Sequence, residues 1–107
     1  MGTLNELIHQ PLRLRLMAVL VALQPDAQIG FTALRDLLEL TDGNLGAHLR
    51  KLEEAGYVAV TKTFVARKPQ TFLSATPLGR QAFAEHVAAL EVILQTGKPT
   101  EQKPAGG

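Results

Sequence analysis

The chain has 107 residues, of which 46% are hydrophobic and 5% aromatic, so it can form one domain with an aliphatic core and is too short for two. Its formal net charge of +1 indicates no class of partner by itself. It contains no cysteine, which excludes disulfides, thiolate zinc sites and thiol redox sensing. The longest apolar run, Leu16–Leu23, is much shorter than the roughly 20 residues of a membrane-spanning helix. We therefore expect a cytoplasmic protein that does not bind membranes.

The first predicted helix follows a lead-in of residues 1–10. Pro11 suits the first helical position, because its missing N–H group needs no partner there, and Pro25 ends the helix after about Leu23. The second half of this helix is apolar all round. It must therefore be buried centrally or shared with a partner chain.

The next two helices are expected to form a helix-turn-helix. A short strand is expected at 29–31. Thr32 then suits the N-cap of a helix over 33–39, and Thr41 suits the N-cap of a helix that ends before Gly56. Only a few residues separate these two helices, which is typical of the helix-turn-helix arrangement.

A β-hairpin is predicted next. Tyr57–Phe64 is rich in Val, Thr and aromatic residues and has the composition of a strand. Gln70–Ala75 is its expected return strand, and residues 66–69 form the expected tip. Charge is uneven along this part of the chain: from Gly43 to Arg80 there are six Lys or Arg residues and only two acidic residues. The surface around the hairpin is therefore expected to be locally basic.

A final helix is predicted after the hairpin. Thr76 is a suitable cap and Pro77 a suitable first residue for a helix to about Gln95. Residues 96–107 offer nothing to bury and are expected to be disordered. The predicted fold is mainly α with a small β-hairpin (α+β), in one domain over residues 1–95.

The helix that begins at Thr41 is amphipathic. Leu45, Leu49 and Leu52 share one stripe, which should pack against the preceding helix. The opposite side is polar or small. Taken alone, this pattern also fits an ordinary helix with a solvated charged face. Its position between a tight helix–turn and a basic hairpin favours a nucleic-acid contact.

The outward side of this helix carries groups that suit DNA. Asn44 can pair bidentately with adenine, while Arg50 and Lys51 suit phosphates or guanine. Small residues near its N-terminus allow close approach to base pairs. The DNA-binding candidates of this helix are Thr41, Gly43, Asn44, Ala47, His48, Arg50 and Lys51.

The tip of the predicted hairpin is basic. Arg67 and Lys68, together with Lys62, could hold the phosphate backbone or reach the minor groove. The alternative is that these cations only keep an exposed sheet edge from pairing with other chains.

Two sequence stretches resemble a known family. The stretch FTALRDLLELTDGNLGAHLRKLEEAGYV, followed by the basic hairpin and TPLGRQAF, is similar to winged helix-turn-helix regulators related to the MarR and ArsR repressors, and most similar to a compact, stand-alone bacterial subgroup. The similarity covers about residues 8–94. It implies a dimer on a roughly palindromic operator, with the helix at 41–55 in the major groove and the hairpin at 61–69 as the wing. His48 matches the family, whereas Gly46 stands where many relatives have Ser, so this chain lacks the hydroxyl contact that the resemblance implies at that position.

The sequence does not favour catalysis or a cofactor. His9, His48 and His86 lack metal-ligand spacing. A site formed by His9 and His86 across a dimer is conceivable, but lone histidines are more often surface residues. There is no phosphate-binding loop and no nucleophile motif. We therefore expect no metal, no cofactor and no enzyme activity, and no effector can be named.

Both terminal helices have more apolar surface than one small domain needs. All of that surface could cover the chain's own core, but two such helices also suit a two-fold interface. The predicted function is that of a dimeric regulator, a repressor that binds double-stranded DNA; the alternative is a winged-helix protein-interaction module. The candidate interface residues are Leu16, Leu20, Leu23, Val87, Leu90, Ile93 and Leu94.

Overall fold

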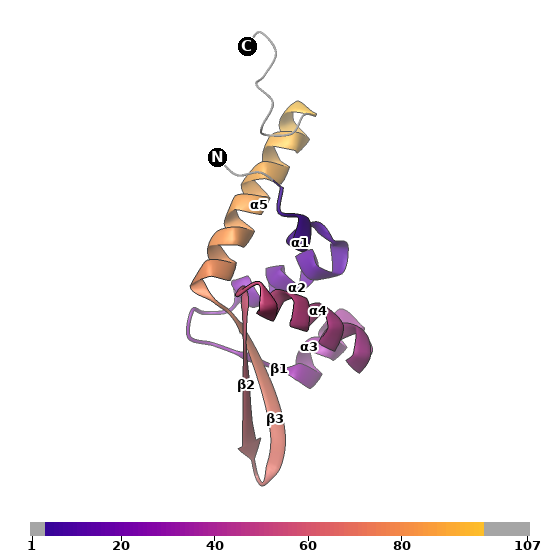
Figure 1. Cartoon of the computed structure of the whole chain (residues 1–107), viewed down its shortest axis with the longest axis vertical. Coiled ribbons are helices and arrows are strands. Elements are labelled where there is room, and N and C mark those ends of the chain that lie inside the picture. The colour runs from indigo at the N-terminus through magenta and orange to yellow at the C-terminus, as the bar shows by residue number, and fades with distance from the viewer. Residues whose placement is uncertain (1–3, 98–107) are drawn as a thin grey trace.

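The computed structural model describes residues 4–97. It confirms the α+β class and the predicted order of elements, with one added short helix at the start (Figure 1). The elements are α1 (Glu6–His9), α2 (Pro11–Ala22), β1 (Ile29–Gly30), α3 (Phe31–Leu38), α4 (Asp42–Glu54), β2 (Val58–Val65), β3 (Lys68–Ala75) and α5 (Pro77–Thr96).

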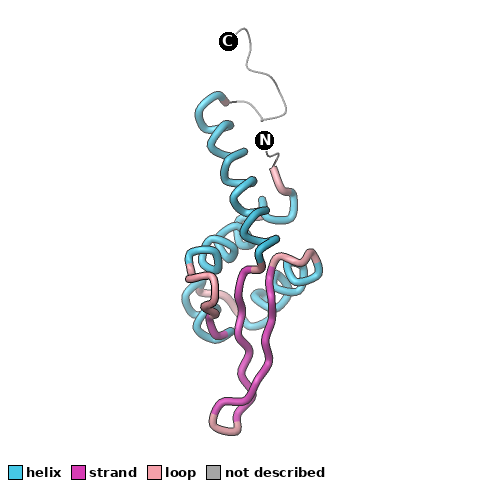
Figure 2. The backbone as a smooth tube through the Cα atoms, turned by 90° about the vertical axis from the view of Figure 1, so that its left-hand side faces the viewer, coloured by secondary structure: helices cyan, strands magenta, loops and turns pink. Residues whose placement is uncertain are grey.

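The β2–β3 hairpin and the C-terminal end of α5 point to opposite ends of the molecule (Figures 1 and 2). The sheet is antiparallel with strand order β1-β3-β2. Because β1 has two residues and pairs only with Leu73 and Phe72 of β3, the distal half of the hairpin is a two-stranded ribbon. Helices α1 to α4 lie between the two ends.

Helix α2 is central, as its all-round apolar character predicts. Leu16, Met17 and Leu20 have no exposed area. Together with Leu34 of α3 and Leu45 of α4 they belong to one continuous core. Leu16 and Leu20 were candidate dimer contacts; this was wrong, because the core of a single chain already covers them completely.

The first turn of α5 packs closely against the segment that follows α4. Thr76 donates from its hydroxyl to the carbonyl of Gly56 (2.6 Å) and accepts from the N–H of Gly79 (2.9 Å). A Cβ atom at Gly79 would lie 2.1 Å from the carbonyl oxygen of Tyr57. Arg80 donates to the carbonyls of α2's last turn, Val21 (3.0 Å) and Leu23 (3.1 Å). The stretch TPLGR therefore connects α5 to α2 and to the segment after α4, and Arg80 stabilises the fold.

Helix α1 was not predicted, and long-range contacts hold it. The Asn5 side chain accepts from the N–H of Ile8 (3.0 Å) and donates to the Tyr57 hydroxyl (3.0 Å). The Asn5 N–H donates to Nδ1 of His86 (2.8 Å). His86 is completely buried on the inner face of α5, so its expected surface position was wrong.

Two further local predictions were wrong. Helix α3 begins at Phe31 with Gly30 as N-cap and no side-chain cap, because β1 runs directly into the helix; Thr32 is therefore inside it. The hairpin turn consists of Ala66 and Arg67 alone, both at positive φ (50° and 66°), so β3 starts at Lys68. Of the expected disordered tail, Thr96 ends α5 and Gly97 caps it; residues 98–107 lie outside the described part of the chain.

Candidate nucleic-acid interface

The helix-turn-helix is fixed by side chains at the turn. As predicted, the Thr41 hydroxyl caps α4 by accepting from the N–H of Asn44 (3.1 Å). Arg35 of α3 donates to the carboxylate of Asp42 (2.7 Å) and is paired with Asp36 (2.9 Å). These carboxylates raise the pKa of Arg35, Asp42 contributing most through its hydrogen bond. The Thr41 cap and the pair of Arg35 with Asp42 therefore link the turn and α3 to the first turn of α4.

Helix α4 is amphipathic, as the sequence predicts: one side faces the core and the other faces outward. Its three leucines are buried. A Cβ atom at Gly43 or at Gly46 would meet nothing within 4 Å, so packing within the chain does not require either glycine. The exposed candidates on this helix are Thr41, Gly43, Asn44, Ala47, Arg50 and Lys51.

His48 is half-buried and has a partner that the sequence analysis missed. Its Nδ1 lies 3.4 Å from a guanidinium nitrogen of Arg13, at the start of α2. Arg13 is held by a hydrogen bond to the carbonyl of Leu7 (2.6 Å). Burial, followed by the charges of Arg13 and Lys51, lowers the pKa of His48, which favours its neutral form. The sequence signal that could have pointed to Arg13 was its charge, because the predicted helix around it is mostly apolar.

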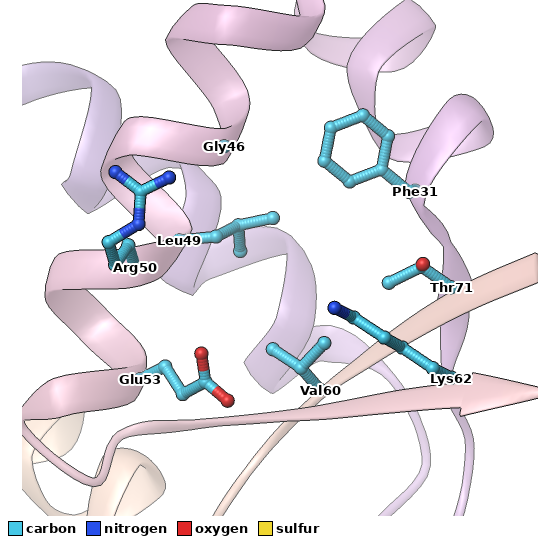
Figure 3. A pocket seen from close by; sticks show the side chains of 8 residues that line it. All are labelled: Phe31, Gly46, Leu49, Arg50, Glu53, Val60, Lys62 and Thr71. Atoms are coloured by element: carbon cyan, nitrogen blue, oxygen red, sulfur yellow. The ribbon is translucent and has the colours of Figure 1, made fainter.

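A groove separates α4 from the wing (Figure 3). Its wall on the α4 side carries Arg50 and Glu53, and its wall on the wing side carries Lys62. Figure 3 shows the Lys62 side chain reaching from β2 into the groove. The apolar and small lining residues are Phe31, Gly46, Leu49, Val60 and Thr71.

The wing presents the predicted cations to solvent. Lys62, Arg67 and Lys68 are all exposed. Within residues 4–97 the ion pairs are those of Arg35 with Asp36 and Asp42, so none of these three cations is neutralised by a carboxylate. No Asp or Glu occurs between Glu54 and Glu85. The wing can therefore offer its positive charge to an external anion.

Sequence reasoning also missed two exposed apolar side chains near the wing tip. Phe64 is 73% exposed and Val65 is 50% exposed. An aromatic residue inside a strand is normally attributed to packing, so the pattern alone could not separate these residues from core residues.

The remaining candidates lie away from this interface. His9 and His86 meet within one chain, with ring centroids 5.4 Å apart, rather than across two chains. No group of three or more potential metal ligands occurs among residues 4–97. Leu94 is 83% exposed, whereas Leu23 packs partly against the core. No helix in this range is both long and apolar enough to cross a membrane.

Comparison with known proteins gives consistent results. The family "Winged helix DNA-binding domain" matches residues 12–94. The uncharacterized protein MJ0432 of Methanocaldococcus jannaschii is 34% identical over 96 residues, which cover 90% of this chain and 98% of that protein. A transcriptional regulator homologue from Pyrococcus horikoshii OT3 superposes with a TM-score of 0.76 at 28% identity, covering 85% of this chain and 87% of its own. A PadR family regulator from Eggerthella lenta shares the fold, with a TM-score of 0.63, 23% identity, and 76% and 75% coverage.

Proposed function

Because the chain belongs to the winged helix DNA-binding domain family, we propose that it is a sequence-specific double-stranded DNA-binding transcriptional regulator that acts as a homodimeric repressor and catalyses no reaction. The observation that carries this proposal is the groove between α4 and the wing. Arg50 on one wall and Lys62 on the other are in no ion pair within residues 4–97, and Glu53 on the α4 wall is the one carboxylate that lines the groove. A phosphate backbone entering this groove would meet positive charge on both sides.

The exposed side chains divide into two roles. Arg50, Lys51 and the wing cations are long and exposed and suit phosphates, which set position without reading sequence. Asn44 is exposed beside the N-terminus of α4 and suits a base edge in the major groove. Arg13 and His48 form the edge of the same surface.

Dimerisation is supported by the far end of α5. Its inner face is buried at Ala82, His86 and Ala89, but its last turns extend past the other helices (Figure 2), where Leu94 is 83% exposed. A second copy would cover this apolar side chain and would place two recognition helices on one duplex. A small protein bound to its operator acts most simply by covering that DNA. This favours a repressor over an activator.

The exposed pair Phe64 and Val65 favours a second candidate function. These two side chains expose apolar surface on both faces of the wing tip. Exposed apolar surface is typical of protein-binding sites, so the wing could instead contact a protein. Protein binding is not needed to explain the basic groove. The two functions can be distinguished by how strongly binding depends on salt concentration.

The test begins with selection of bound sequences from random duplex DNA. We expect a consensus with two-fold symmetry. Replacing Arg67 and Lys68 by Ala should weaken binding to all duplexes and lower the slope of log affinity against log salt by about 0.9 for each lost phosphate contact. Asn44→Ala should act mainly on the selected site, costing about 1–3 kcal/mol.

Two outcomes would contradict the proposal. If the parent protein showed no salt-dependent affinity for any duplex, the protein-interaction function would replace it. If the double variant bound as well as the parent at low and moderate salt, the wing would have no role in binding.

A further inference from the structure

The strand register places Phe64 on the groove side of the wing. Residues paired directly across β2 and β3 share one face of the ribbon, and that face repeats every second residue. Lys62 pairs with Thr71, and both line the groove. The next pair on the same face is Phe64 with Pro69. The distal end of this face is therefore an apolar pair.

Cations surround this apolar pair. Lys62 precedes it on the same face, Arg67 follows it in the turn, and Lys68, the cross-strand partner of Val65, extends from the opposite face beside the turn. These side chains are exposed and unpaired with any carboxylate of residues 4–97. A surface with an apolar centre and a cationic rim complements a base step between two phosphate backbones.

We propose that Phe64, backed by Pro69, is a wedge that enters the minor groove of the bound duplex, partly unstacks one base step and bends the DNA. This inference rests on the proposed DNA-binding function and specifies how the wing engages DNA. Aromatic and proline side chains are among those that separate base steps from the minor groove and kink the duplex. Lys62, on the same face, and Arg67, in the turn, hold the phosphates on either side of that step.

Packing in the core does not account for Phe64. A side chain that is 73% exposed contributes little to the core. Val65, its neighbour, lies on the opposite face of the ribbon and pairs with Lys68. It therefore provides a control residue with the same neighbourhood, similar apolar character and the other orientation.

The experiment uses the duplex carrying the selected consensus. One set of duplexes carries 2-aminopurine at successive adenines opposite the wing, and another carries a fluorophore at each end to report bending by energy transfer. The proteins are the parent, Phe64→Ala, Phe64→Leu and the control Val65→Ala. Circular dichroism and thermal unfolding establish that each variant is folded. Because Phe64 and Val65 are both exposed, we expect their replacement to leave the fold intact.

We expect the parent to raise 2-aminopurine fluorescence at one step in each half-site and to shorten the distance between the duplex ends. Phe64→Ala should lose both signals and about tenfold in affinity, since stacking of an aromatic residue on a base is of that order. Phe64→Leu should keep part of both signals, because leucine can also act as a wedge. Val65→Ala should match the parent.

Failure of the wedge is distinguishable from failure of DNA binding. A parent that binds the consensus duplex in a salt-dependent manner without unstacking or bending it overturns the wedge alone. Unstacking that is equal in the parent and Phe64→Ala also overturns it. A parent with no affinity for any duplex overturns the proposed function as well. Co-flotation with phosphatidylserine vesicles that is lost in Phe64→Ala, with duplex binding unchanged, would assign the apolar pair to a lipid surface instead.

Discussion

The two residues of the wing turn both have the left-handed backbone conformation. Ala66 has φ 50° and Arg67 has φ 66°. This is the geometry of a two-residue hairpin turn, for which Asn-Gly is the favoured sequence. A side chain with a Cβ atom in this conformation costs about 1 kcal/mol. A residue that breaks a local conformational preference is a reason to look for a function of its side chain, and here that side chain is a cation at the tip of the wing.

Replacing each turn residue by glycine should separate conformation from charge. Arg67→Gly relieves the strained φ and removes the cation, so we expect the free energy of unfolding to stay equal or to rise by up to about 1 kcal/mol, while DNA affinity falls. Ala66→Gly makes the same conformational change without loss of charge and should leave affinity unchanged. Thermal unfolding and a salt titration of duplex binding measure both. Equal affinities for the two variants would remove Arg67 from the interface.

His86 is a buried titratable group, and we expect it to make the stability of the fold depend on pH. It is completely buried, Nδ1 accepts from Asn5, and Nε2 has no hydrogen-bond partner in the described structure. Burial, and next the charge of His9, lowers its pKa below the ordinary 6.5. Because Nδ1 is the acceptor, a second proton on this ring would displace the Asn5 hydrogen bond that holds α1.

We therefore expect stability to fall as pH falls below about 6.5. In the window between the ordinary pKa and the lowered folded pKa, the unfolded chain binds the proton and the folded chain does not, so acidification favours unfolding. Above 6.5 this contribution is fully present. Thermal unfolding at a series of pH values should show a smaller loss on acidification in His86→Gln than in the parent. The same pH dependence in both proteins would assign the effect to other groups, of which His48 is the first candidate because its pKa is also lowered.

At the scale of single elements, the same substitution should have opposite effects at two helical glycines. In α5, a Cβ at Gly79 would meet the backbone of Tyr57 at 2.1 Å, so Gly79→Ala should destabilise the fold by about 1–3 kcal/mol or more. In α4, Gly46 has open space around it, so Gly46→Ala should stabilise the fold by about 0.5–1 kcal/mol through helix propensity. Denaturant unfolding measures both. Equal effects would mean that α5 can move away from Tyr57.

Elements whose signals are local could be predicted from the sequence. Helix α4 has a Thr41 cap and a leucine stripe, and both were confirmed. Helix α1 has four residues, too few for a periodic pattern, and depends on a hydrogen bond between Asn5 and His86, which are 81 positions apart. No local pattern contains that information.

The candidate interface likewise combines features that local sequence patterns predict with features that depend on the tertiary structure. The exposed positions of α4 and of the wing cations follow from helical and strand periodicity and were confirmed as exposed. The role of Arg13 depends on how α2 lies against α4, which is a property of the tertiary structure. The groove-side position of Phe64 depends on the hairpin register, which follows from a turn of two residues where four were expected.

At the scale of the whole molecule, the fold places the candidate DNA interface at one end and the uncovered part of α5 at the other (Figure 1). The apolar surface predicted for dimerisation divides accordingly. The α2 part belongs to the core of one chain, because Leu16 and Leu20 are fully buried. The part that a second copy could cover lies on α5: Val87, Leu90 and Ile93 are half-buried, and Leu94 is 83% exposed.

Association through α5 should therefore be sensitive to charge on one side of that helix. Leu90→Glu places a carboxylate in the apolar stripe and should raise the dimer dissociation constant by at least about tenfold, which corresponds to about 1.4 kcal/mol. Ala88→Glu adds the same charge two residues away, at an exposed position on the opposite side of the helix, and should leave association unchanged. Light scattering over a micromolar concentration series measures both variants against the parent.

The same pair of variants also tests whether association matters for DNA recognition. A dimer holds two recognition helices on one duplex, so the second half-site is bound at a high effective concentration. Leu90→Glu should then lose much more affinity for a duplex with both half-sites of the consensus than for a duplex with one, while Ala88→Glu should bind both duplexes as the parent does. A parent that stays monomeric at every concentration and binds both duplexes equally would place a single winged helix on DNA and leave the end of α5 for another partner.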